Sequence, residues 1–177
     1  MNADATRQSP PGSLAAFRPG HAARERLRNF QLAREALRRD DARALMKRLA
    51  GLSPDGQFSL AFYPARPLRF VEAAARADAA ACLAALVAAG AELTPLAIEL
   101  AIVGNERKYA PPSLPPRSDC QALRWLFASG RLDPFGCGPP GSEALARDSR
   151  RLRAGVAEAV EEARSRARSA RAGQAAS

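Results

Sequence analysis

Three stretches of the chain repeat one arrangement of capping, apolar and turn positions. In each, a capping residue is followed five positions later by Leu, then by a second apolar residue four positions further on, and then by Gly. The three instances are Asp40–Leu45–Leu49–Gly51, Asp78–Leu83–Val87–Gly90 and Ser118–Leu123–Phe127–Gly130. The Leu positions lie 38 and 40 residues apart. Self-similarity at this period predicts a stack of helical hairpins, because one hairpin cannot bury its own apolar face.

Apolar residues recur at helical spacing on both sides of each capping position. The pattern predicts helices over 24–39 and 41–49, over 68–77 and 79–89, and over 94–103 and 119–128. Asp40 and Asp78 are expected to cap the second helix of their own hairpins, and Gly51 and Gly90 to end those helices. Thr94 and Pro95 have the residue types that favour the first two positions of a helix.

The remaining segments are rich in breakers or in Arg. Pro, Gly and Ser predict a disordered tail over 1–22. The helical repeat domain is then expected over 24–133, with an ordered loop over 53–67 in which Phe58, Leu60 and Phe62 alternate as a short extended piece. A Pro-rich insertion covers 106–117 and a Pro/Gly linker covers 134–142. The segment 143–177 predicts an exposed Arg-rich helix whose last third frays or is disordered.

Composition favours an all-α class. Hydrophobic residues make up 47% of the chain and aromatic residues only 6%, with Ala the largest component. Closely packed helices suit this mixture better than a β-sandwich does. The three Cys residues have no disulfide or zinc-site spacing, so Cys82 and Cys120 are expected to be buried free thiols. Without a signal peptide or an apolar run long enough to cross a membrane, the sequence predicts a cytoplasmic protein.

The net charge of +9 leaves two interpretations open. Basic residues favour binding to nucleic acid or to anionic surfaces. Coding bias in a GC-rich bacterial genome also produces a chain rich in Ala and Arg and poor in Lys. Basic residues are spread over the whole sequence, which favours the second interpretation.

The second hairpin resembles an ankyrin repeat. Ala73-Ala74-Ala75, Asp78, Leu83, Leu86 and Gly90-Ala91-Glu92-Leu93 follow that family's pattern, and Thr94-Pro95-Leu96 resembles the opening of the next repeat. The resemblance covers roughly 29–133. It departs from the family at Arg69-Phe70-Val71-Glu72, where the family has Thr-Pro-Leu-His, and in the insertion of the third hairpin. Ala-rich hairpins of another solenoid type produce much of the same pattern.

Residues for common catalytic chemistry are missing from the sequence. The only His is His21, and no Gly-rich phosphate loop is present. Asp40-Asp41 is interpreted as helix capping rather than as a catalytic carboxylate pair. The sequence therefore predicts a protein that is not an enzyme and that needs no cofactor or metal.

Two functions remain as hypotheses. The resemblance implies binding of another protein through the face and loops of the stack, with Phe62, Tyr63, Arg107, Lys108, Tyr109 and Trp125 as candidate contacts. A bacterial regulatory adaptor or an effector exported by a specialised secretion system would fit this hypothesis. The alternative is nucleic-acid binding by the C-terminal helix through Arg150, Arg151, Arg153, Arg164 and Arg168. The absence of an aromatic residue from that helix weighs against the alternative.

Overall fold

The computed structural model describes residues 21–50, 57–58, 68–103, 119–136, 142 and 155–175. These residues are mostly helical, so the predicted all-α class is confirmed. The helices are α1 (His21–Arg39), α2 (Ala42–Leu49), α3 (Phe70–Arg76), α4 (Ala80–Ala88), α5 (Pro95–Val103), α6 (Gln121–Ala128) and α7 (Val156–Ala175). Within the described part of the chain, the strands β1 (Gln57–Phe58) and β2 (Leu68–Arg69) pair antiparallel.

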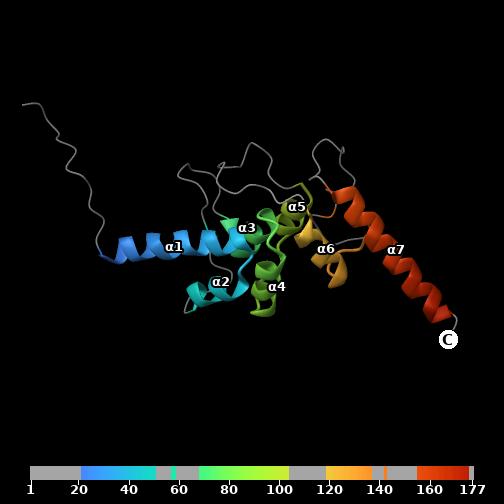
Figure 1. Ribbon diagram of the computed structural model, residues 1–177, viewed down its shortest axis with the longest axis horizontal. Coiled ribbons are helices and arrows are strands. Elements are labelled where there is room, and N and C mark those ends of the chain that lie inside the picture. Colours follow the sequence, from blue (N-terminus) through green and yellow to red (C-terminus); the bar gives the residue numbers. More distant parts are fainter. Residues whose placement is uncertain are drawn as a thin grey trace, which may run out of the picture.

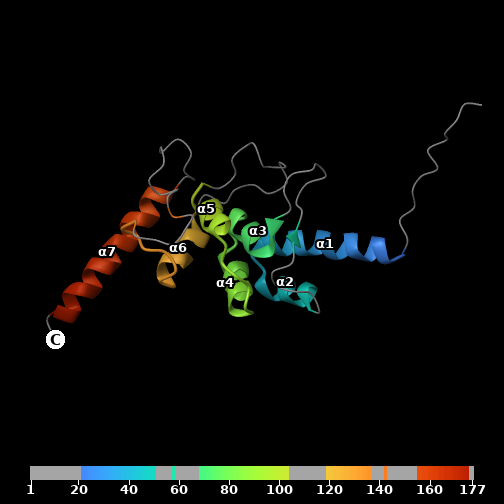
Figure 2. The same cartoon turned by 180° about the vertical axis from the view of Figure 1, so that it is seen from behind.

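The first six helices form three successive hairpins. α1 packs on α2, α3 on α4, and α5 on α6. Figure 1 shows α1, α3 and α5 in one layer and α2, α4 and α6 in the other, and Figure 2 shows the same two layers from behind. α4 contacts both α2 and α6, so the second helices form one continuous row, and α7 packs against α6 at its far end.

Most helix boundaries agree with the sequence pattern to within two residues, and those of α1 and α7 differ more. The predicted helix over 68–77 begins only at Phe70, because Leu68 and Arg69 belong to β2. The prediction that the last third of the C-terminal helix frays is wrong, since α7 continues to Ala175. Ala and Arg have high helix propensity, which favours an unbroken helix there. α1 also begins at His21, inside the stretch predicted as the tail.

The first helices of the first two hairpins, α1 and α3, are each followed by an aspartate in the left-handed region. The φ angle is 57° at both Asp40 and Asp78. The N–H of the next residue donates to a carbonyl five positions back, Asp41 to Ala36 at 2.9 Å and Ala79 to Ala74 at 2.9 Å. These bonds form the motif in which Gly is the usual residue, and Asp is among the few others that adopt this conformation readily.

The two aspartates do not cap their own hairpins, which corrects the sequence-based assignment. The Asp40 carboxylate accepts from the N–H groups of Ala81 and Cys82 on α4, at 3.1 and 2.9 Å. The Asp78 carboxylate accepts from the N–H of Ala122 on α6 at 2.8 Å. Asp41, not Asp40, caps α2 by accepting from Ala44 N–H at 2.8 Å. The left-handed backbone carries each carboxylate away from the helix that follows it and toward the next hairpin.

A buried glutamate links the first helices of the second and third hairpins. One carboxylate oxygen of Glu72 accepts from the backbone N–H of Arg69 at 2.9 Å, and the other accepts from the Thr94 hydroxyl at 3.0 Å. Thr94 in turn accepts from Ala97 N–H at 3.1 Å, as expected for the residue that caps α5. The start of α3 is thereby tied to the start of α5.

The core runs without interruption through the three hairpins and into α7. Its largest fully buried side chains include one Leu in the first turn of each second helix, Leu45, Leu83 and Leu123. Cys82 and Cys120 are buried thiols, as predicted, whereas Cys137 lies outside the described residues. Gly90 and Gly130 end α4 and α6 with φ angles of 97° and 68°.

Replacing Leu86 by Ala should destabilise the protein by about 2–5 kcal/mol, because it removes a fully buried side chain and leaves a cavity. Leu93 is only half-buried, so the same substitution there should cost less. Urea unfolding followed by circular dichroism measures both. Equal midpoints for the Leu86→Ala variant and the wild type would contradict the packing of α4.

Replacing Asp78 by Gly should destabilise the protein by about 1–3 kcal/mol, because the N–H of Ala122 loses its acceptor in a buried setting. Gly keeps the left-handed backbone, so the loss reports the carboxylate. Asp78→Ala should cost more than Asp78→Gly, since Ala resists a positive φ. The same urea unfolding serves here, and a Gly variant as stable as the wild type would show that the link between the hairpins contributes nothing.

Candidate interaction surface

The helices α2, α4 and α6 each present exposed or half-exposed positions on the outside of the stack. In contrast, all seven residues of α3 in the first layer are buried, including Glu72 and Arg76. Burial lowers the pKa of the Arg76 guanidinium from its usual value by removing it from water. A partner approaching the described part of the stack therefore meets the second helices rather than α3.

This second-helix face, defined as the exposed and half-exposed positions of α2, α4 and α6, has no acidic residue on its three helices. On α2 the exposed side chains are Arg43, Lys47 and Arg48. On the next helix, α4, the exposed and half-buried positions are all alanines except Val87; Ala81 and Ala88 are exposed, and Ala84 and Ala85 are half-buried between them. The second-helix face is therefore cationic at α2 and apolar, with short side chains, at α4.

Trp125 lies on the same face at its other end. Its ring is half-buried and packs against the core, and the Arg131 guanidinium lies over it, 5.8 Å from the ring centroid. Arg131 itself is exposed. An indole that is partly open and has a cation above it is the type of side chain that anchors protein interfaces. This is the one candidate contact of the protein-binding hypothesis that the described residues include.

The other candidate contacts of the protein-binding hypothesis lie outside the described residues. They are Phe62, Tyr63, Arg107, Lys108 and Tyr109. Arg150, Arg151 and Arg153 of the nucleic-acid alternative also lie outside, whereas Arg164 and Arg168 lie on α7. The sequence hypotheses did not include Lys47 or Arg43, although both occupy the exposed side of a helix whose apolar stripe was already evident.

α7 closes the C-terminal end of this face. Val156 and Ala159 are buried, at 2% and 1% exposure, so the helix is not simply exposed as the sequence predicted. Arg124 of α6 forms ion pairs with Glu158, at 3.7 Å, and with Glu162. Arg164 donates to the carbonyl of Pro134 at 2.9 Å, which fixes the segment after α6 against α7. Both apolar packing and polar bonds hold the helix.

No described helix combines the length and the apolar character that a membrane crossing requires. Among the same residues, no group of three or more His, Cys, Asp or Glu side chains is placed to hold a metal ion.

Comparison with known proteins does not add a relative. No family model, no curated protein and no solved structure matches the chain. The function must therefore be argued from the geometry of this chain alone.

Replacing Val156 by Ala should weaken the docking of α7 by about 1.5–3 kcal/mol, because its side chain is almost fully buried. Arg124→Gln should cost less than about 1 kcal/mol, since both of its glutamate partners are partly exposed. Amide hydrogen exchange of residues 156–175 measures the opening of this helix. A larger effect of Arg124→Gln than of Val156→Ala would mean that charge, not packing, holds α7.

Proposed function

We propose that the chain is a non-enzymatic protein-interaction module, an ankyrin-like stack of three helical hairpins that binds a partner protein through its second-helix face. The single observation that carries the proposal is the continuous row of α2, α4 and α6, with its cationic end, alanine centre and Trp125. Stacked repeats commonly use such extended surfaces for binding. Ankyrin-like character is itself part of the proposal, and its support is the repeat spacing together with the hairpin order.

Charge and shape narrow the chemistry of the partner. Arg43, Lys47 and Arg48 favour an acidic surface, and no carboxylate on the three helices opposes it. The alanines of α4 allow a close approach, because they project no long side chain toward the partner. The partner segment that fits is an amphipathic helix with acidic residues on its polar side and apolar residues along the other.

The setting of this interaction is proposed to be cytoplasmic. Cys82 and Cys120 are reduced thiols buried in the core, a state that suits a reducing compartment. Export into a host cell remains a hypothesis from the sequence, and the second-helix face would serve an adaptor or an effector equally.

Reversing the charge of Lys47 should weaken partner binding about fivefold, because a cation on the second-helix face becomes an anion facing an acidic segment. The probe is a synthetic helical peptide of Glu and Leu patterned as above, titrated while the emission of Trp125, the only Trp in the chain, is recorded. Lys47→Glu is compared with the wild-type chain.

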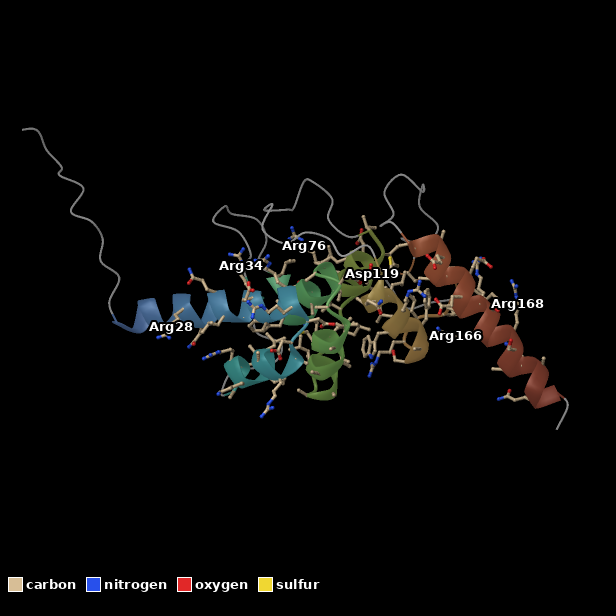
Figure 3. The ribbon with its side chains drawn as sticks, in the orientation of Figure 1. Arg28, Arg34, Arg76, Asp119, Arg166 and Arg168 are labelled. Carbon is tan, nitrogen blue, oxygen red and sulfur yellow. The ribbon has the colours of Figure 1, made fainter. Side chains whose placement is uncertain are left out.

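Arg28→Glu supplies the matched control. Arg28 is an exposed cation on α1, outside the second-helix face, and Figure 3 shows it on the part of α1 that extends beyond α2. This variant has the same net charge as Lys47→Glu. Equal weakening by both variants would attribute binding to net charge alone, and full affinity of Lys47→Glu would rule out the second-helix face. Proteins captured from nuclease-treated lysate should follow the same order of variants.

A further inference from the structure

The last turns of α7 form a strongly basic surface. After Glu162 the sequence contains four arginines and no acidic residue. Figures 1 and 2 both show this end of α7 extending away from the hairpins. The positive charge is therefore open to a large ligand on several sides.

Three of these arginines share one side of the helix. At 100° per residue, Arg164, Arg168 and Arg171 fall within about 60° of one another, whereas Arg166 points the opposite way. Figure 3 agrees in placing Arg166 and Arg168 on different sides of α7. Arg166 pairs with Glu162, one turn earlier. Arg168 is exposed and takes part in no ion pair found among the described residues.

An aromatic ring from another segment lies on the same side. Phe135 is 38% exposed and is the one large apolar side chain of the described residues that is classed with the exposed positions. The guanidinium of Arg171 lies 5.4 Å from the centre of its ring and that of Arg164 lies 6.0 Å away. The helix sequence lacks an aromatic residue, and the segment that follows α6 supplies one.

Local bonds hold Phe135 in this position. Its backbone N–H donates to the Asp133 carboxylate at 2.9 Å, which forms a tight turn. The bond from Arg164 Nε to the Pro134 carbonyl then ties that turn to α7. Arg164 is thus a positioning residue, whereas Arg168 and Arg171 remain available to a ligand.

We infer that Phe135, Arg168 and Arg171 form a binding site for single-stranded nucleic acid. The guanidinium groups contact successive phosphates, and a base stacks on the open part of the Phe135 ring or on the Arg171 guanidinium above it. The inference concerns a second surface and goes beyond the proposed protein-binding function, since neither depends on the residues of the other. The ring distinguishes this ligand from a duplex, whose bases already stack on one another, and from a lipid surface, which offers phosphate but no base.

The test measures binding of a fluorescent 12-nucleotide oligothymidylate to the full-length chain by anisotropy. The double variant Arg168→Gln/Arg171→Gln should bind at least about tenfold more weakly. The slope of log affinity against log salt should fall by about 1.4, because two phosphates are no longer neutralised by the protein. Arg166→Gln removes one positive charge instead of two, from the other side of the helix. It should change the affinity less than about twofold. The single variant Arg168→Gln has the same net charge as Arg166→Gln. It should nevertheless weaken binding more than Arg166→Gln does.

Phe135→Leu separates stacking from charge, because it keeps an apolar side chain and removes the ring. It should weaken binding of the oligonucleotide and leave binding of inorganic polyphosphate unchanged. Circular dichroism of each variant checks that α7 is retained.

Three results would overturn the inference. One is equal weakening by Arg166→Gln and Arg168→Gln, and another is full affinity of Phe135→Leu. The third is binding of vesicles containing phosphatidylserine, with the same dependence on Arg168 and Arg171, while the oligonucleotide is not bound. Lys47→Glu should leave oligonucleotide binding unchanged, so failure here is distinguishable from failure of the protein-binding proposal.

Discussion

The arrangement of the hairpins depends on a carboxylate placed where a helix would ordinarily end on Gly. Asp40 and Asp78 adopt the left-handed conformation that ends their helices, and the same residues cap α4 and α6, which lie 42 and 44 positions further along the chain at Cys82 and Ala122. Gly would satisfy the backbone with less strain, but it has no group that could reach the next hairpin. Neither α4 nor α6 donates a backbone N–H to the side chain of its own capping residue; the acceptors of these N–H groups come from the preceding hairpin.

This dependence gives the stack a direction and two different ends. In the first described hairpin, α2 is capped by its own Asp41, which accepts from the N–H of Ala44. At the other end Cys120 has the positive φ, and a thiol cannot extend the series of carboxylate links. At that end α7 packs against α6 through apolar contacts and through the ion pairs of Arg124. Neighbouring hairpins therefore stabilise one another in order, which is the source of cooperativity in repeat proteins.

Local sequence signals made the helices predictable. They did not predict which residues of other hairpins each helix contacts. The Leu period and the terminal glycines identified the second helices, since both act within a few residues. An Asp at this position can cap the helix that follows it or accept a hydrogen bond from another hairpin. At Asp78 the positive φ angle directs the carboxylate to the N–H of Ala122 in the next hairpin. Phe135 was missed for a related reason, because 29 positions separate it from Arg164, which lies beside it in the structure. Trp125 was the exception among candidate contacts, because its position on a second helix follows directly from the repeat.

The basic residues of the chain have more than one role in the structure. Arg124 and Arg164 are partners of carboxylates and of a carbonyl within the fold, so they contribute to packing α7 rather than to attracting a ligand. Lys47 on α2 and Arg168 on α7 both have exposed side chains. The net charge of +9 therefore does not indicate whether the partner is a protein or a nucleic acid. What distinguishes the two surfaces is the apolar group that accompanies the cations: the alanines of α4, which packs against the helix of Lys47, and the aromatic ring of Phe135 next to Arg171.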